Sequence, residues 1–473
     1  MAQRKKKKTP NSTPTPSVEE PSGKGWMDWL ARVCEHYVPD ALTTSIIMMV
    51  ALAALALTLG NTVTETVDAY YRGLWRLMAF TMQMTLMLTL SLVLAETPVF
   101  KRSVLRVSRI PKTYPGVVIG AVLVTAMIAY ANWGLSIALG PLVAIHFCKQ
   151  AERKGIPVDF NWIMAVLAGA GSVWQFGLSA SAPLQMTAEN HFLADRTPPM
   201  PLSTTIWSPA AITMVISFLA VTMVVGILFG PKKRKPISEY AESNKLAEAA
   251  ITGELATHVD VTRKHTFAQK LERTSFTLLP MWLALGAWLA YHFFSKKASL
   301  DINSMITILL LSCFLLHGTV ARFSEALQRV IVSVWPIIVM YHLYAGVGGL
   351  IEFTEVGAFI TNSVAPISNA YTLPFLTAAI STVVATFIPS SGGQWAIQGA
   401  VTVTTAEVAG ISVQRNLLAL SVGDHMGNLI SPFWAVVGAG IARVDFRKIF
   451  GYRLIFAAIW FVMGVLIFTF LPC

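Results

Sequence analysis

Charged side chains are scarce in this chain of 473 residues. Asp, Glu, Lys and Arg make up 13% of it, whereas a soluble protein carries roughly 25%. Hydrophobic residues make up 54%, and the mean hydropathy is +0.59. So few charges cannot cover a soluble globule of this length, which excludes soluble enzymes and nucleic-acid-binding proteins. The net charge of +11 therefore needs a membrane explanation.

Cysteine and catalytic motifs are equally rare. The four cysteines, Cys34, Cys148, Cys313 and Cys473, form no CxxC pair, so neither a disulfide framework nor a metal site is expected. No HExxH, GxGxxG or ATP-binding loop is present. We expect no catalytic residue, no cofactor and no enzyme activity. Any transport would have to be driven by an ion gradient or by the gradient of the solute itself.

Long apolar blocks take the place of charge. The blocks without Asp, Glu, Lys or Arg are 41–64, 77–95, 113–148, 160–188, 197–231, 274–295, 302–321, 330–351, 356–406, 425–442 and 454–473. Spanning a bilayer takes about 20 apolar residues, and most of these blocks reach that length. The fold class predicted is therefore an all-α polytopic membrane protein.

The N-terminal region precedes these blocks. Residues 1–25 are polar and rich in Lys, Pro, Ser and Thr, which predicts a disordered basic tail. Residues 26–38 place aromatic and aliphatic side chains at helical spacing, which predicts an amphipathic helix in the membrane interface. A soluble helix packed on the first loop is the alternative. The first apolar block starts only at Ala41 and is long enough to span, so we expect no cleaved signal peptide.

The distribution of Lys and Arg predicts the orientation. With a cytoplasmic N-terminus, 30 of the 36 Lys and Arg residues fall in segments assigned to the cytoplasm. One of these segments is the long polar loop 232–273. The block 274–295 then forms a linking span between a first transmembrane repeat at 41–231 and a second at 302–473.

The two repeats show the same order of features. Each holds a block too long for one span, broken at Asn132-Trp133-Gly134 in the first and at Pro389–Trp395 in the second. Each such block predicts a re-entrant helical hairpin. A broken crossing follows each hairpin, near Asp424 in the second half, and each carries a small-polar stretch ending in a proline, at 169–183 and at 423–432. The odd number of spans between the repeats inverts the second one, giving about nine spans and two re-entrant hairpins in an inverted repeat.

Broken helices at mid-membrane point to transport, because lipid cannot satisfy their free backbone groups. Helix N-termini at a break favour an anion. No Lys or Arg lies in a hairpin or broken crossing, so we expect a small, weakly charged anion held by dipoles and hydroxyls. The predicted substrate-binding residues lie at the hairpin tips and the first broken crossing: Asn132, Trp133, Gly134, Ser181, Ser390, Ser391, Gly392, Gly393, Gln394, Trp395 and Gln398. Helix capping by Asn132 and Gln394, and packing by the two Trp residues, remain open alternatives.

The second broken crossing predicts a cation-coupling site. Asp424 is the only Asp, Glu, Lys or Arg that this topology places inside the membrane, where an ionisable group is expensive unless functional. The residues assigned to coupling Na⁺ or H⁺ are Asp424, His425, Asn428 and Ser431. Alternatively, Asp424 merely neutralises His425.

Five runs carry a resemblance to a known family. They are YVPDAL (37–42), GLWRLMAFTMQM (73–84), NWGLSIALG (132–140), IPSSGGQWAIQGA (388–400) and GDHMGNLISPFWAV (423–436). In this order they resemble the short-chain fatty acid transporters of the AtoE type. The chain differs at Ser391, where a third glycine is usual, at Asp424-His425, where Glu-Gln is usual, and in its longer basic tail.

The resemblance implies uptake of short-chain carboxylates such as butyrate or acetoacetate across a bacterial inner membrane. It also implies kinship with ion transporters that have inverted repeats and move by an elevator-like mechanism. The expected partners are the carboxylate and the lipid bilayer, with no nucleic acid, and small-residue faces permit a homodimer. Transport of another small organic anion, lactate-like or dicarboxylate, and an anion channel are the alternatives.

Overall fold

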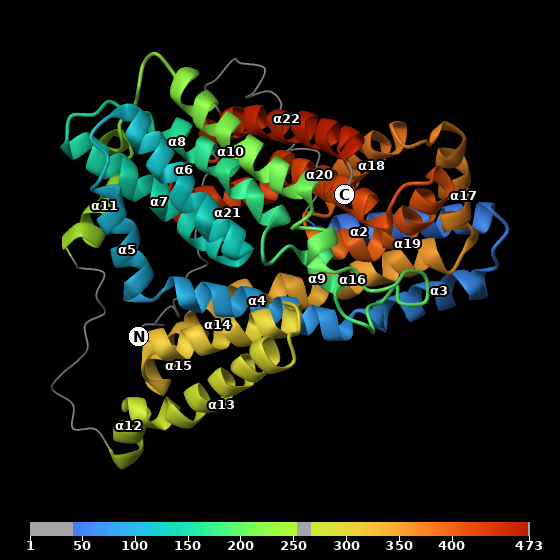
Figure 1. The fold of residues 1–473 in the computed structure, drawn as a ribbon, viewed down its shortest axis with the longest axis horizontal. Coiled ribbons are helices and arrows are strands. Elements are labelled where there is room, and N and C mark those ends of the chain that lie inside the picture. Colours follow the sequence, from blue (N-terminus) through green and yellow to red (C-terminus); the bar gives the residue numbers. More distant parts are fainter. Residues whose placement is uncertain (1–40, 253–265, 472–473) are drawn as a thin grey trace, which may run out of the picture.

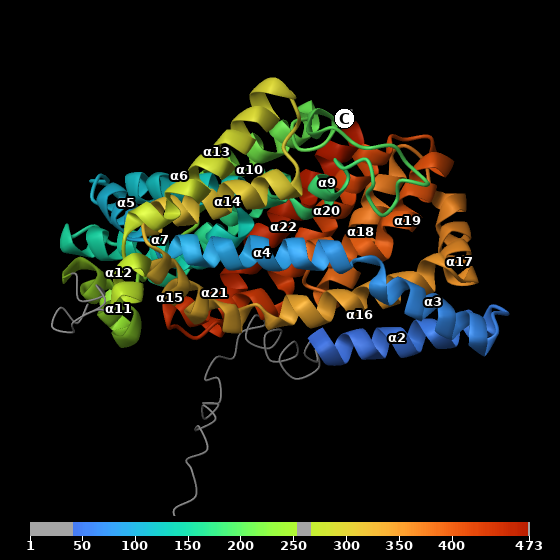
Figure 2. The same cartoon turned by 90° about the horizontal axis from the view of Figure 1, so that it is seen from below.

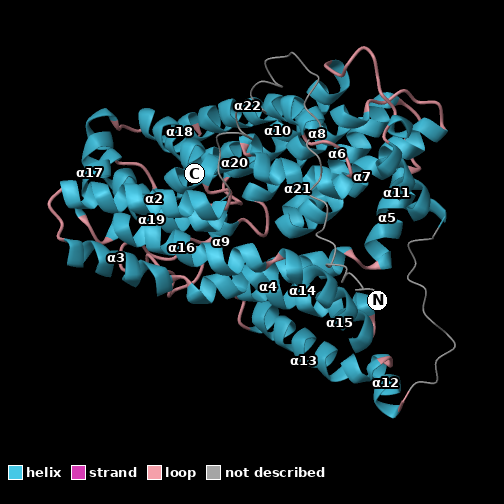
Figure 3. Cartoon of the chain, turned by 180° about the vertical axis from the view of Figure 1, so that it is seen from behind, coloured by secondary structure: helices cyan, strands magenta, loops and turns pink. Residues whose placement is uncertain are grey.

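The computed structural model describes residues 41–252 and 266–471, and these ranges form helices and no strand (Figures 1 and 3). The all-helical fold class predicted from the apolar blocks is thus confirmed for the described residues. The predicted tail at 1–25 and the predicted interfacial helix at 26–38 lie outside the described residues.

The described part of the first half, 41–228, forms the ten helical elements named next, and a further 3₁₀ turn, η2 (Leu202–Thr204), precedes the last of them. They are α2 (Ala41–Thr58), α3 (Val63–Arg76), α4 (Met78–Ala95), α5 (Pro98–Ser108), α6 (Tyr114–Ala131), α7 (Trp133–Arg153), α8 (Phe160–Gly171), the 3₁₀ helix η1 (Ser172–Phe176), α9 (Ser181–Gln185) and α10 (Pro209–Leu228). The loop after them carries α11 (Ala241–Thr252) and α12 (Phe267–Glu272), and α13 (Leu279–Ala290) lies in the predicted linking span.

The second half has a similar order of helices. Its helices are α14 (Ile302–His317), α15 (Val320–Val330), α16 (Trp335–Glu352), α17 (Glu355–Val364), α18 (Thr372–Phe387), α19 (Ser391–Ala409), α20 (Val413–Ile430), α21 (Pro432–Ala442) and α22 (Arg447–Phe470). Equivalent helices also make equivalent contacts. α4 packs on α14 and α7, and its counterpart α16 packs on α2 and α19. Figure 2 shows α4 between α14 on one side and α16 on the other.

Several helices are long and apolar enough to cross a bilayer. Within the described residues there are six such segments, or seven if the pair bent by 71° between α16 and α17 counts as one span. Other apolar helices are shorter: α14 has 16 residues, which at 1.5 Å per residue gives about 24 Å, less than the ~30 Å of a hydrocarbon core. The number of about nine spans with two re-entrant hairpins stays a prediction.

The helix breaks lie close to the positions predicted from the sequence, but three helix boundaries differ from the prediction. In the first half Asn132 adopts an extended conformation between α6 and α7. In the second half the break covers only Ile388–Ser390, because Pro389 keeps Ile388 out of the α region, and Trp395 lies inside α19.

The other two differences concern α20 and α22. The break expected near Asp424, within the stretch 423–432, lies at the end of that stretch: α20 continues through Asp424 to Ile430 and ends at Ser431, before Pro432. The last span was expected to begin at residue 454, but α22 begins at Arg447 because the seven residues ahead of the apolar block, 447–453, continue the same helix.

Close helix crossings hold the first half against the second. A Cβ on Gly73 of α3 would lie 2.7 Å from the Cα of Gly349 of α16, so these two backbones touch because neither residue has a side chain. Buried apolar side chains form separate clusters around α4, α14 and α16, around α7 and α8, and around α18 to α20. Residues at the helix breaks belong to these clusters, such as Trp133 and Ile388 in the first and Phe176 in the third.

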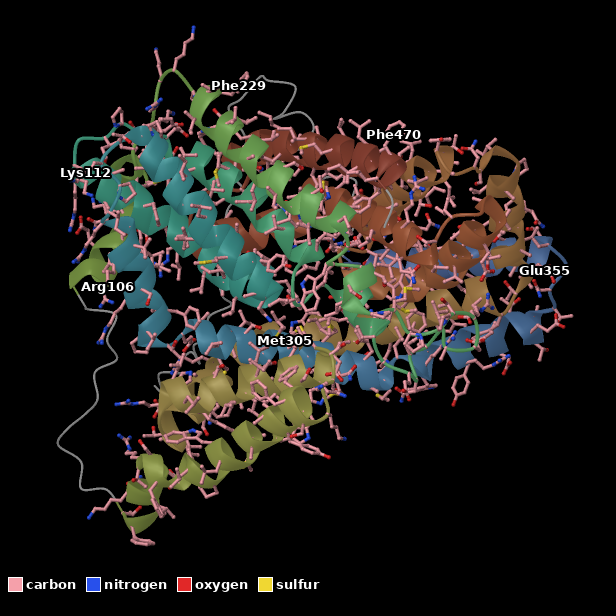
Figure 4. All side chains as sticks on the ribbon, viewed as in Figure 1. Arg106, Lys112, Phe229, Met305, Glu355 and Phe470 are labelled. Carbon is pink, nitrogen blue, oxygen red and sulfur yellow. The ribbon has the colours of Figure 1, made fainter. Side chains whose placement is uncertain are left out.

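The segment that follows α4 is basic and the segment that follows α16 is acidic, and the two lie at opposite ends of the molecule. Figure 4 places Arg106 and Lys112, from the basic connector after α4, at one end of the long axis and Glu355, from the acidic connector after α16, at the other. Equivalent connectors at opposite ends are what two halves with opposite orientation require.

Candidate functional site

A cavity of about 680 Å³ lies between α4, α7, α16 and the broken segments of both halves. This volume is within the roughly 300–1,000 Å³ of small-molecule sites. Most of its wall is apolar, with side chains such as Leu88, Leu92, Met164, Ile337 and Met340. Polar side chains reach the wall from both halves: Ser181, Ser390, Ser391, His425, Asn428 and Arg453.

The second tip, Pro389–Ser391, forms part of the cavity wall. Ser390 caps α19, because its Oγ accepts a hydrogen bond from the N–H of Gly393 at 3.3 Å. Since α19 begins at Ser391, its positive end lies at the cavity. This tip therefore offers hydroxyl groups and a helix N-terminus to an anion.

The two glycines of this tip face protein rather than the cavity. A Cβ on Gly392 would lie 2.5 Å from the ring of Phe80, and a Cβ on Gly393 would lie 2.7 Å from the ring of Tyr344. They allow the tip to pack tightly against α4 and α16. Their place beside aromatic rings explains the glycine pair without any substrate contact.

Three other predicted residues of the tip lie behind it. The amide of Gln394 donates to the carbonyl of Ser381 at 2.8 Å and to Oε1 of Gln398 at 2.6 Å. Trp395 is fully buried and lies edge-on to Phe192. None of these side chains lines the cavity. The two glutamines join α19 to Ser381 of α18 and so anchor the tip.

The first tip, Asn132–Gly134, is more completely occupied by protein contacts. The Asn132 Oδ1 accepts hydrogen bonds from Ser91 Oγ at 2.7 Å and from the N–H of Leu135 at 2.9 Å. The N–H of Trp133 donates to Ser179 Oγ at 2.9 Å, and a Cβ on Gly134 would collide with Ser91. Of the three predicted residues, only Trp133 lines the cavity. The capping role left open for Asn132 is therefore observed.

Asp424 lies where the two halves meet. It is fully buried, and its carboxylate accepts hydrogen bonds from the side-chain amides of Gln175 and Asn428, the second at 3.2 Å. Gln175 also donates to Ser391 Oγ at 3.3 Å. Gln175 belongs to η1 in the first half and Ser391 to the second tip, so one amide joins both broken segments to the carboxylate. Among the described residues, no Lys, Arg or His forms an ion pair with Asp424.

His425 is separated from Asp424. Its ring lies edge-on to Trp174, with centroids 5.7 Å apart, and to Trp460, with centroids 5.0 Å apart. Both ring nitrogens are buried and have no hydrogen-bond partner among the described residues. His425 therefore packs between indole rings at the cavity wall and does not neutralise its neighbour. Ser431 is buried where α20 ends, outside the cavity lining.

Asn428 contacts three other groups. Its Nδ2 donates to Asp424, and its Oδ1 accepts from the indole of Trp434 at 3.1 Å. Its main-chain carbonyl accepts from a guanidinium nitrogen of Arg453 at 3.2 Å. The same Trp434 indole donates to the carbonyl of Pro389 at 3.0 Å. Asn428 thus links Asp424, the second tip and Arg453.

Arg453 is the charged residue that the sequence argument missed. Asp424 was expected to be the only Asp, Glu, Lys or Arg inside the membrane, but Arg453 also lies in a helix long and apolar enough to span, is buried there and lines the same cavity. The last span was predicted from the charge-free block 454–473, which begins directly after this arginine. Hydropathy averaged over a window is the signal that could have included it, because the helix 447–470 is apolar enough to span despite its basic residues.

Comparison with known proteins identifies the family. Residues 27–469 match the sequence profile described as "Short chain fatty acid transporter". The chain belongs to the short-chain fatty acid transporter family. The resemblance found in the sequence runs is therefore confirmed.

Two relatives support this membership over nearly full length. A "Putative short-chain fatty acid transporter" of Haemophilus influenzae is 27% identical over 452 residues, covering 92% of this chain and 98% of the relative. A protein of the same name from Escherichia coli is 25% identical over 448 residues, covering 93% and 98%.

A solved structure shares the fold of this family member. The YdaH transporter of Alcanivorax borkumensis, whose crystal structure is described as having an unusual topology, aligns with a TM-score of 0.58. The alignment covers 91% of this chain and 98% of the other at 14% identity. The chain is therefore a multi-pass membrane protein with a transporter fold.

Proposed function

We propose that this short-chain fatty acid transporter family member takes up short-chain carboxylates, such as butyrate or acetoacetate, together with H⁺ or Na⁺. The observation that carries the coupling is the buried carboxylate of Asp424, which has two amide donors and no ion pair among the described residues. A buried charge without a partner is costly. Binding a proton or a sodium ion removes that cost, so this position suits a coupling ion.

The carboxylate substrate is proposed to bind in the cavity beside this cluster. The hydroxyls of Ser390 and Ser391 and the N-terminus of α19 favour a small anion, and the apolar wall favours its alkyl chain. Trp133 adds a buried indole N–H that has no acceptor among the described residues. The cation and the anion would then bind on two sides of Asn428.

We further propose that the two halves form an inverted repeat that moves in an elevator-like manner between inward-facing and outward-facing states. The matched order of helices, their matched contacts and the opposite ends of the two connectors support the repeat. We place the N-terminus in the cytoplasm and the chain in a bacterial inner membrane, on the positive-inside distribution of Lys and Arg. The homodimer stays a prediction from the small-residue faces.

The test is uptake of labelled acetate, butyrate, acetoacetate and succinate into proteoliposomes under imposed Na⁺ or pH gradients. We expect butyrate or acetoacetate to accumulate above equilibrium under one of the two gradients. Accumulation of succinate or a lactate-like acid alone would favour the alternative of another organic anion. Flux that never exceeds equilibrium under any gradient would favour an anion channel and refute coupling.

A further inference from the structure

The position of Arg453 is unusual for a basic residue in this chain. It lies six residues inside α22, about 9 Å along the helix axis from Arg447, and only 8% of it is exposed. Basic residues near helix ends normally extend to the interface, but this one is buried at the wall of an apolar cavity. Its place is therefore not explained by charge at the membrane surface.

The hydrogen bonds of Arg453 leave most of the guanidinium unused. Its acceptor among the described residues is the main-chain carbonyl of Asn428, at 3.2 Å, and its Nε is buried without an acceptor. A guanidinium has five N–H donors. No carboxylate of the described residues forms an ion pair with it. A helix carbonyl alone leaves the positive charge uncompensated in a low-dielectric wall, which is costly.

The other arginine at the cavity differs on each of these points. Arg329 is half exposed and makes two hydrogen bonds to the carboxylate of Glu96, at 2.6 and 3.0 Å. It is therefore already neutralised near solvent. Of the two arginines that line the cavity within the described residues, Arg453 is therefore the one without an anionic partner.

We infer that Arg453 binds the carboxylate group of the substrate and selects monocarboxylates over dicarboxylates and uncharged analogues, an inference that rests on the proposed function. The planar guanidinium suits a carboxylate in a two-point contact. It lies near the second tip, because Asn428 and the Trp434 indole connect it to Pro389 by hydrogen bonds. A dicarboxylate would leave its second charge against the apolar wall with no cation to pair it.

The experiment compares purified wild-type protein with Arg453→Gln by calorimetric titration of butyrate, its neutral analogue butyramide, and succinate. Wild type should bind butyrate at least tenfold more tightly than the other two. Arg453→Gln should bind butyrate about 10- to 100-fold more weakly, the range for loss of a charged hydrogen-bonding partner. Butyramide binding should stay the same, so that the preference for the charged ligand disappears. Arg453→Lys keeps the charge but not the planar fork and should recover part of the affinity.

The matched control is Arg443→Gln, which removes an exposed arginine after α21 that pairs with Glu242 at 3.5 Å. It should keep the wild-type affinities. A measurement on wild type covers the case in which Arg453→Gln does not fold. Modification of arginines by phenylglyoxal, followed by mass spectrometry, should show Arg453 protected by butyrate and not by butyramide, with Arg443 unaffected.

The possible outcomes separate the two proposals. If wild type binds no carboxylate at all, the proposed function fails. If wild type binds butyrate but Arg453→Gln keeps the same preference over butyramide, or butyrate gives Arg453 no protection, the inference about Arg453 is wrong and the function stands.

Discussion

Asp424→Asn is the change that most directly tests ion coupling. The substitution keeps the size of the side chain and removes the negative charge. At present the carboxylate accepts from the amides of Gln175 and Asn428. The side chain of an asparagine has one acceptor oxygen, which can serve only one of these two amides. Its NH₂ group would face the other amide, donor against donor. Leaving one buried polar group unsatisfied costs about 1–3 kcal/mol, so the variant should fold with a lower melting temperature.

The effect on transport should be much larger than the effect on stability. With one ion moved per carboxylate, a tenfold ion gradient provides about 1.4 kcal/mol and supports about tenfold accumulation. An amide neither carries a proton nor binds Na⁺ by charge. Asp424→Asn proteoliposomes should therefore reach only equilibrium, while exchange of labelled for unlabelled butyrate continues in part.

The control for this variant is Glu407→Gln, the same chemical change on the exposed face of α19. It should accumulate butyrate like wild type. If Asp424→Asn also concentrates butyrate about tenfold with an unchanged ion dependence, Asp424 is structural. The coupling ion would then have to bind to backbone carbonyls.

Three other predictions follow from the packing and the topology. Gly393→Val should lower the melting temperature, by an overpacking cost of about 1–3 kcal/mol, because its Cβ would lie 2.7 Å from the Tyr344 ring; wild-type stability in a thermal-shift assay would contradict this. In wild type, Na⁺ or H⁺ should raise the affinity for butyrate, and Asn428→Ala should largely abolish this increase, as measured by titration of butyrate with and without the ion. An increase as large as in wild type would show that Asn428 takes no part in the coupling. In a cysteine-free background, Glu355→Cys should react with an impermeant maleimide in intact cells and Lys233→Cys should not; the reverse pattern would invert the topology.

The helix breaks could be predicted from the sequence because their signals are local. An asparagine between two apolar runs caps the following helix, and a proline followed by serine does the same in the second half. The contacts of the tips could not be predicted in this way. The hydrogen bond between Gln175 and Asp424 joins residues 249 positions apart, and it forms only after the two halves have folded on one another.

The same limitation explains why Gly392 and Gly393 were assigned to the substrate. A glycine pair at a helix break fits close approach of a ligand as well as close approach of a ring. The sequence does not say whether Phe80 and Tyr344 fill that space, and the structure places both rings there. Ser390 and Ser391, in contrast, were predicted at the cavity and line it.

The two buried charges of the cavity region are joined through a single residue, Asn428. Its side-chain amide donates to Asp424 and its main-chain carbonyl accepts from Arg453, so a shift of this residue alters the surroundings of both charges. If a cation at Asp424 raises the affinity of Arg453 for a carboxylate by some factor, the carboxylate must raise the affinity for the cation by the same factor. Binding both ions also removes two unpaired charges from the protein interior at once. Under the proposed function, this shared contact at Asn428 is the route by which binding of one ion could raise the affinity for the other, as symport requires.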